Sequence, residues 1–247
     1  MFSDADAAAL YDLLNPWDPE SRPEDAFYFP LVMAARSVLD LGCGTGTMLR
    51  LARERGHTGR LAGLDPDRAA LDRARRRTDI DWIEATADRA QPGAGFELAT
   101  MTGHAFQNLL TDRAVHDSLT AVRAALRPGG RFAFETRHPQ ARAWEGWSRA
   151  NPDDHSEVTE PSGRTLRYWH DVSGVDGEIV SITGTVALPD GTVLRVLTED
   201  LRFLAPDALD AHLTAAGFEI EARYGDWARG PVDAASREII TVARRPA

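Results

Sequence analysis

The sequence predicts an α/β fold with a doubly wound, mostly parallel sheet and a late antiparallel insertion. Short apolar segments alternate with amphipathic helical segments between residues 37 and 136. A glycine-rich turn follows the first apolar segment. Between residues 165 and 203, strand-like alternation continues without any helical segment. Strands and helices that alternate with short connections are typical of a parallel sheet covered on both faces, whereas consecutive strands indicate a meander.

The first half of the chain contains five predicted strands and the helices between them. A tight turn at Pro128, Gly129 and Gly130 precedes the fifth strand. The predicted strands cover residues 37–41, 60–64, 80–85, 96–102 and 131–136, and the predicted helices cover residues 47–55, 67–77 and 113–126.

The second half departs from this rhythm. Residues 139–160 are polar and contain several prolines, so we expect a loop or short helices there. Residues 165–203 predict an antiparallel meander, with turns at 174–177 and 189–191. A helix over 205–216 has Pro206 in its first turn, a favoured position for proline. Residues 218–224 and 238–243 predict a closing pair of strands.

Composition excludes several classes of protein. With 247 residues, 43% hydrophobic and 27% charged, the chain is an ordinary globular mixture. Its net charge of −10 argues against nucleic acid as a partner. One cysteine rules out an intramolecular disulfide, and the histidines show no metal-ligand spacing, so we expect no metal. No apolar run approaches the about 20 residues that span a bilayer. We therefore expect a cytoplasmic protein without membrane contact.

The acidic residues are unevenly distributed. Residues 1–30 carry a charge of −6, residues 151–200 carry −7, and the remainder carries +3. Two interpretations are open: two solvated surfaces, or an acidic mouth that attracts a cationic substrate such as an amine.

The most informative stretch is the segment VLDLGCGTG, residues 38–46. Glycines at the end of a strand allow a tight turn, close approach of a ligand to the backbone, and packing of the next helix. Thr47 stands where the dinucleotide-binding fingerprint has glycine or alanine, which disfavours a nicotinamide cofactor. Asp40 lies inside the strand and needs a hydrogen-bond donor if it is buried.

A second carboxylate ends the next strand. Asp65 lies 19 residues after Gly46, and an acid at the tip of the second strand is placed to accept two ribose hydroxyls. Its alternative role is to cap the helix predicted to begin at Asp67.

These motifs, with LRPGGRFAFET at residues 126–136, resemble the class I S-adenosylmethionine (SAM)-dependent methyltransferases over residues 36–138. The resemblance implies a seven-stranded Rossmann-like sheet with one antiparallel strand in its final pair. It also implies an enzyme that uses SAM and releases S-adenosylhomocysteine. The tail ITVARRP ends as such domains often do.

The resemblance assigns roles to individual residues. Gly42, Cys43 and Gly44 would line the methionine side of SAM, and Asp40 would orient its amino group. Asp65 would hold the ribose and Pro66 would lie beside the adenine. The family's acid for the adenine amine is replaced by Thr86, or is supplied by Asp88 in a shifted register. The remaining residues expected to line the cofactor site are Tyr11, Ala87, Thr102, Gly103 and Phe106.

The Gly103-His104 pair after the fourth strand, with the later insertion, resembles small-molecule N-methyltransferases of the glycine and amino-sugar types. Because histidine titrates near neutral pH, His104 is the leading candidate for a catalytic base that keeps an amine neutral. Its alternative is a helix-capping or substrate-shaping role. The candidate substrate-binding residues are Tyr28, Arg137, Trp144, Tyr168 and His170. Two roles are open for Arg137: it binds a carboxylate of the substrate, or it forms a salt bridge within the protein. Two roles are also open for the aromatic residues: they form a lid over the substrate, or they only pack against their neighbours.

The resemblance also suggests a division of the chain. We expect a helical arm or lid at residues 1–35, a SAM-binding core at 36–138, a loop and antiparallel substrate lid at 139–204, and closing core elements at 205–247. The expected reaction is methyl transfer to a small-molecule acceptor, most simply an amine, by a monomer or homodimer. The alternatives are O- or C-methylation, a non-methylating SAM enzyme such as a cyclase, and a catalytically silent binding module.

Overall fold

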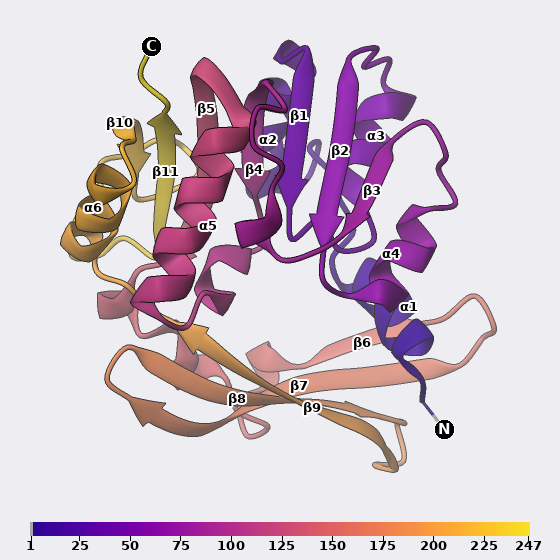
Figure 1. Ribbon diagram of the computed structural model, residues 1–247. Coiled ribbons are helices and arrows are strands. Elements are labelled where there is room, and N and C mark those ends of the chain that lie inside the picture. The colour runs from indigo at the N-terminus through magenta and orange to yellow at the C-terminus, as the bar shows by residue number, and fades with distance from the viewer. Residues whose placement is uncertain (1) are drawn as a thin grey trace.

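The computed structural model describes residues 2–247 and contains two sheets (Figure 1). The larger sheet has seven strands in the order β10-β11-β5-β4-β1-β2-β3, and the smaller has four in the order β6-β7-β8-β9. In the larger sheet, β11 runs antiparallel to both of its neighbours, while β1 to β5 pair in parallel. This confirms the predicted α/β fold with an antiparallel insertion after the fifth strand.

The strands of the large sheet are buried because both of their faces are covered. Leu39 and Leu41 in β1 pack with α5 and α6 on one face, and Val38 packs with α2 and α3 on the other. The elements of this core are β1 Ser37–Leu41, α3 Thr47–Glu54, β2 Arg60–Asp65, α4 Arg68–Ala74, β3 Asp81–Glu84, β4 Phe96–Met101, α5 Asp112–Ala125, β5 Leu126–Arg137, α6 Pro206–Ala215, β10 Glu219–Tyr224 and β11 Glu238–Arg244.

Several of the predicted boundaries change, most of them by a single residue. The turn at Pro128 to Gly130 is a bulge inside β5, since pairing with β4 shifts between Phe96 and Leu98 and the strand already begins at Leu126. Helix α4 ends at Ala74, three residues before the predicted end at Arg77. Beyond this end of the helix, the Arg77 side chain donates a hydrogen bond to Asp79 Oδ1.

The insertion forms the four-stranded sheet, which we call the lid sheet. It crosses the end of the core at which β1 and β2 terminate (Figure 1). A short strand was missed at residues 156–159, inside the predicted loop, because these four residues are mostly exposed and carry no apolar alternation. The lid sheet consists of β6 Ser156–Thr159, β7 Thr165–Asp176, β8 Ile179–Ala187 and β9 Val193–Arg202.

The N-terminal segment contains two helices, α1 Asp4–Leu14 and α2 Pro23–Ala34. Leu10 of α1 is buried against Leu166 and Val186 of the lid sheet. Asp12, on the same helix, accepts hydrogen bonds from Arg73 of α4 and from Thr45 of the glycine-rich turn. Helix α1 therefore touches both the core and the lid sheet.

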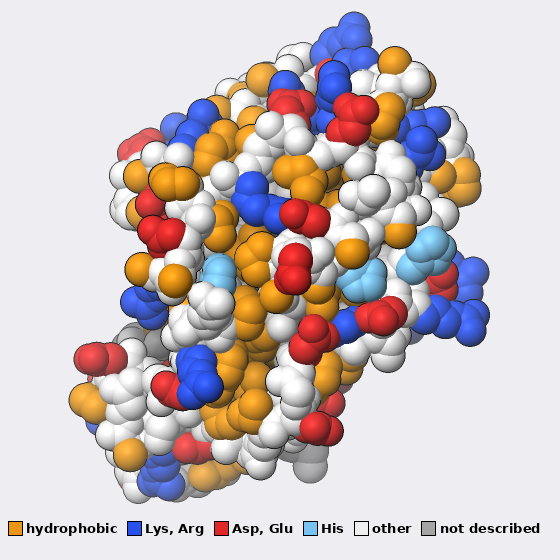
Figure 2. Space-filling model, turned by 90° about the vertical axis from the view of Figure 1, so that its left-hand side faces the viewer, with side chains coloured by type: hydrophobic (Ala, Val, Ile, Leu, Met, Phe, Trp, Pro, Cys, Tyr) orange, Lys and Arg blue, Asp and Glu red, His pale blue; other side chains and the backbone are white. Residues whose placement is uncertain are grey.

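Short 3-10 turns complete the structure, at Ala87–Arg89, Ala105–Asn108, Pro139–Ala141, Ala143–Gly146 and Pro152–Asp154. Among the described residues, no helix is long and apolar enough to cross a membrane. On the face shown in Figure 2, arginines and acidic residues are interspersed around a band of hydrophobic side chains.

Candidate active site

The glycine-rich turn after β1 adopts a backbone that favours glycine. Gly42, Gly44 and Gly46 have φ angles of 68°, 54° and 74°. A Cβ at Gly46 would lie 2.3 Å from the Trp82 ring, whereas one at Gly44 would meet no other atom within 4 Å. The turn therefore packs against Trp82 at Gly46 and is open at Gly44, so a ligand can approach the backbone of Gly44 closely.

Asp65 fixes the shape of this turn. Its Oδ2 accepts the Gly44 N–H at 2.7 Å, and its Oδ1 accepts the Asp67 N–H at 2.7 Å. Burial raises the pKa of Asp65, and these two backbone donors oppose that effect. The helix-capping alternative for Asp65 is not what the structure shows, because Asp67 itself caps α4.

Asp40 is buried beneath the turn, with 2% of its surface exposed. Its Oδ1 accepts a hydrogen bond of 2.8 Å from Thr100 Oγ1 in the neighbouring strand. Burial raises the pKa of Asp40 to about 7, with Asp65 and Glu135 adding repulsion. A cationic group bound nearby would stabilise the ionised carboxylate.

The residues expected around the adenine lie at the ends of β2 and β3. Pro66 and Thr86 are exposed, and Ala87 is buried at the start of a 3-10 turn. Thr86 Oγ1 donates to Asp88 Oδ1 at 2.5 Å. The two candidates for the adenine amine are therefore hydrogen-bonded to each other and form one polar unit.

A buried polar chain leads to His104. The Tyr28 hydroxyl donates to Glu135, and Glu135 Oε1 accepts the His104 N–H at 2.8 Å. His104 Nε2 lies 2.9 Å from Glu238 Oε2, and its backbone is left-handed, with φ 61°. Tyr28, which was expected to contact the substrate, is only 1% exposed, and its hydroxyl is hydrogen-bonded to Glu135.

The segment after β4 brings the predicted cofactor residues together. A Cβ at Gly103 would lie 3.5 Å from the Tyr11 hydroxyl of α1, and the Tyr11 side chain is exposed. Thr102 is half-buried at the end of the strand. Phe106 is only 2% exposed and stacks on Phe134 at 4.5 Å, which leaves little of its surface for a cofactor.

Arg137 ends β5, and its guanidinium bonds to a neutral side chain. Its Nη1 donates to Gln107 Oε1 at 2.9 Å, and its guanidinium lies 5.0 Å from the Trp147 ring centre. Among the described residues no carboxylate is within ion-pair distance of it, so the salt-bridge alternative is not what the structure shows. Trp144 packs edge-on against Phe203 at 4.6 Å, in a hydrophobic cluster under the lid sheet.

Tyr168 and His170 lie on β7 of the lid sheet. Both are half-buried, and their side chains are 3.1 Å apart between Tyr168 Oη and His170 Nε2. Glu199 of β9 is near them. Partial burial raises the pKa of its carboxyl group, and the charges of Arg137 and His170 act in the opposite direction.

Sequence reasoning missed several residues of this region: Asp12, Trp82, Gln107, Asp154, Glu199 and Glu238. Glu238 carried a usable signal, because it begins the last predicted strand, which pairs with the strand ending at Arg137. The others depend on contacts between segments far apart in the chain. Within residues 2–247, no group of three or more His, Cys, Asp or Glu residues is placed to hold a metal.

The order of the strands explains why these groups meet. The order reverses between β1 and β4, and ligands of open α/β sheets bind beyond the carboxyl ends of the strands at such a reversal. The glycine-rich turn follows β1 and the Gly103-His104 pair follows β4. The residues fit SAM: an open turn above Gly44, a buried acid at Asp40 and a second acid at Asp65.

Comparison with known proteins agrees with this site. Residues 38–130 match the family described as "Methyltransferase domain". A cypemycin N-terminal methyltransferase of Streptomyces sp. is 27% identical, covering 98% of this chain and 97% of its own. A trans-aconitate 2-methyltransferase of Azoarcus sp. is 32% identical, covering 77% and 79%. The fold matches the solved sugar N-methyltransferase KedS8 of Streptoalloteichus sp., with a TM-score of 0.70, 21% identity, and coverage of 97% and 92%.

These matches extend beyond the site to most of the chain. The relative from Azoarcus covers more than two thirds of both chains at more than 30% identity, and the matched domain contains the glycine-rich turn and Asp65. The cofactor is SAM, and the protein is an enzyme. The chain belongs to the SAM-dependent methyltransferases.

Proposed function

We propose that this enzyme methylates the nitrogen of a small-molecule amine, with His104 as the base. The observation that carries the proposal is the pair of carboxylates around His104. Glu135 holds the backbone of His104, and Glu238 holds its Nε2. Both carboxylates favour a positive charge on His104, which would take the proton that an amine loses.

The contact between His104 Nε2 and Glu238 supports Nδ1 as the ring nitrogen that acts. If Nε2–H donates to Glu238, Nδ1 keeps its lone pair and can accept a proton from the acceptor nitrogen. When bound, SAM supplies a methyl group already activated on a sulfonium. The chain's own residues then orient the amine, exclude water and hold the proton at His104 Nδ1. We further propose that residues 1–35 and 139–204 act as the lids that exclude water.

The names of similar proteins support an amine. The cypemycin enzyme is named for an N-terminus, and KedS8 is described as a sugar N-methyltransferase. The acidic residues Asp40, Glu135 and Glu238 stand on the same side of the core as His104 and favour a cationic ligand.

A second candidate is O-methylation of a carboxylate. Arg137 supports it, because its guanidinium has no acidic partner among the described residues and its planar donors match a carboxylate. The similarity to trans-aconitate 2-methyltransferases points the same way.

The test is a competition among acceptors of defined chemistry. The enzyme and SAM are incubated with an amino-sugar methyl glycoside, an alanyl tripeptide, the same peptide with its amine acetylated, and trans-aconitate, and products are read by mass spectrometry. We expect one added methyl group on a free amine and none on the acetylated peptide. Methylation of trans-aconitate alone would establish the second candidate, and no methylation of any amine would end the first.

A further inference from the structure

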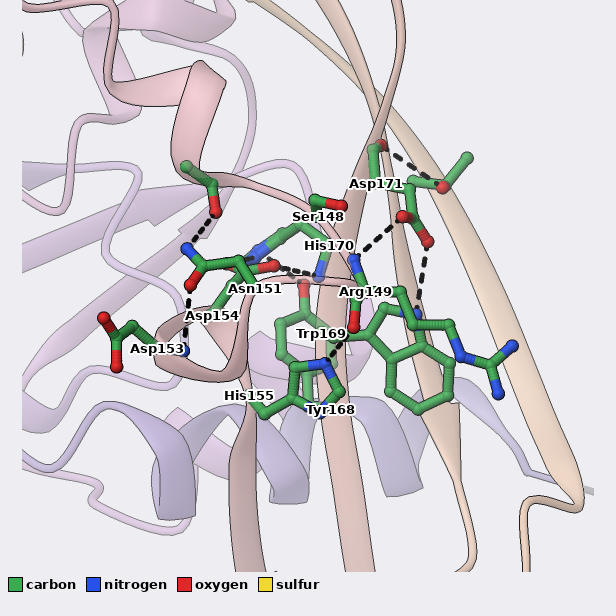
Figure 3. A network of polar contacts seen from close by, with 12 residues as sticks. Ser148, Arg149, Asn151, Asp153, Asp154, His155, Tyr168, Trp169, His170 and Asp171 are labelled. Atoms are coloured by element: carbon green, nitrogen blue, oxygen red, sulfur yellow. Dashed lines mark hydrogen bonds and ion pairs between the residues drawn. The ribbon is translucent and has the colours of Figure 1, made fainter.

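A polar chain on the lid sheet links three side chains (Figure 3). Asp154 comes from the turn Pro152–Asp154, and Tyr168 and His170 come from β7. Asp154 Oδ2 accepts the backbone N–H of His170 at 2.8 Å, and Asp154 Oδ1 lies 2.9 Å from His170 Nδ1. His170 Nε2 lies 3.1 Å from the Tyr168 hydroxyl.

The direction of each hydrogen bond follows from the chemistry of the three groups. An ionised carboxylate only accepts, so His170 Nδ1 carries the hydrogen that Asp154 receives. In the neutral imidazole, Nε2 then has a lone pair and must accept from the Tyr168 O–H. Burial raises the pKa of Tyr168 to about 12, so the phenol keeps its proton. With His170 neutral, the Tyr168 oxygen is left with lone pairs only, and it can accept but not donate.

The chain lies on the face of the lid sheet that is turned toward the core. Residues two apart in a strand share a face, so Tyr168 and His170 lie on the side of Leu166, which packs against Leu10 of α1. Trp169 lies on the other side, where Arg149 and His155 cover it.

Trp147 connects this face of the lid sheet with Arg137 of the core. The Trp147 ring lies 5.9 Å from the His170 ring, and the Arg137 guanidinium lies 5.0 Å from the same Trp147 ring. Opposite His170, Gly184 leaves room for the tyrosine ring: a Cβ there would lie 2.4 Å from the Tyr168 hydroxyl oxygen. The hydroxyl therefore lies over Gly184, on the side that faces the core.

We propose that Tyr168 is a second contact for the methyl acceptor, where its oxygen receives a hydrogen bond from a hydroxyl, amide N–H or ammonium group of that acceptor. Asp154 and His170 are positioning residues. They turn the hydroxyl proton of Tyr168 away from the methyl acceptor. Glu199, an acceptor-only group on the same face, reinforces the preference for donors. This inference rests on the proposed function, since it specifies the acceptor as an amine with a second donor group.

Asp154→Asn provides a test, because it reverses the direction of these hydrogen bonds instead of removing them. The backbone N–H of His170 requires an oxygen at the Oδ2 position, so the new NH₂ group must face His170 Nδ1. It donates there, which moves the histidine hydrogen to Nε2 and makes His170 a donor to Tyr168. Nitrogen NMR of histidine-labelled protein in its S-adenosylhomocysteine complex reads the tautomer.

We expect an Nδ1–H tautomer for His170 in the wild type and Nε2–H in Asp154→Asn. The matched control is His155→Gln, which changes a histidine on the opposite face and should leave the His170 signals in place. A hydrogen on His170 Nε2 in the wild type, in the Nε2–H tautomer or in the imidazolium, would overturn the proposal for any methyl acceptor.

The contact itself is tested with the amino-sugar methyl glycoside and the alanyl tripeptide. Tyr168→Phe keeps the ring and its packing but removes the oxygen, so the KM of the methylated amine should rise about tenfold, as for one lost hydrogen bond. The kcat and the Kd of SAM should change less than twofold, and His155→Gln should match the wild type. An unchanged KM in Tyr168→Phe would refute the contact.

Failure of the proposed function gives a different result. If the wild type methylates neither amine, the amine assignment fails, and the contact is judged by binding of the same two amines to the S-adenosylhomocysteine complex. A saturable shift of the His170 signals that is lost in Tyr168→Phe supports it. The absence of such a shift overturns it.

Discussion

Asp40 shows how burial turns an ordinary carboxyl group into a pH-sensitive one. Its pKa in the folded protein is about 7, above its ordinary value of 3.8. A group with a raised folded pKa contributes stability that is full below pH 3.8 and is lost as the pH rises through about 7. We expect Asp40→Asn to flatten the decrease in unfolding free energy across this window. Urea unfolding at several pH values measures it, and an unchanged slope would show that other buried acids, such as Glu135, dominate.

Asp65 supports the glycine-rich turn, and we propose that it also holds the bound cofactor. Because it holds the Gly44 and Asp67 N–H groups, Asp65→Ala should raise the Kd of SAM and of S-adenosylhomocysteine at least tenfold, a loss of about 1.4 kcal/mol or more. Calorimetric titration measures both ligands. Asp67→Asn is the matched control, since asparagine also caps helices. Equal affinities in Asp65→Ala and the wild type would remove Asp65 from the site.

His104 is tested by its effect on rate and on pH dependence together. General-base catalysis typically contributes about 10² to 10⁴ in rate, while alignment of the reactants remains without it. His104→Asn should therefore slow kcat by that amount without abolishing turnover, and it should remove a limb of the pH profile. A variant with the rate and the profile of the wild type would leave His104 only a shaping role.

At the scale of elements, helix α1 contacts both the core and the lid sheet. Its Asp12 binds Arg73 and Thr45 across to the core, and its Asp4 binds Arg195 of the lid sheet. Asp12 is mostly buried, whereas Asp4 is largely exposed, so the first pair is less screened by solvent.

We therefore expect Asp12→Ala to weaken SAM binding by about fivefold to tenfold, because Thr45 lies in the glycine-rich turn and α1 carries Tyr11 over Gly103. Asp4→Ala is the matched control on the same helix and should change the Kd less than twofold. Hydrogen exchange of α1 should rise in Asp12→Ala alone. Equal exchange and affinity in the two variants would show that the Asp12 contacts do not hold the helix.

At the scale of the molecule, cofactor binding should stabilise the whole fold, because the site is assembled from β1, β2, β4 and α1. A ligand at 100 times its Kd adds about 2.7 kcal/mol to the free energy of unfolding. For a chain of this size the melting temperature then rises by about 5–10 °C. A thermal scan with and without S-adenosylhomocysteine measures the shift. Asp65→Ala should lose most of it, and an equal shift in that variant would place the ligand elsewhere.

The sequence by itself determined the core of this protein. Alternating buried strands and amphipathic helices gave the parallel sheet, and VLDLGCGTG with Asp65 gave the cofactor class, because local backbone geometry at Gly42 and Gly46 admits few other residues. Each of these features is encoded by a short run of neighbouring residues, so the sequence displays it locally.

The tertiary structure alone decided which side chains meet. Tyr28 is buried and its hydroxyl donates to Glu135, and Phe106 is buried against Phe134. Glu238 reaches His104 from 134 residues away, and Asp154 reaches His170 from a segment for which a loop or short helices were expected. Such pairs depend on strand order and on the packing of the lid sheet over the core. No local pattern specifies them, since they arise only when the hydrophobic surfaces of distant segments are buried together.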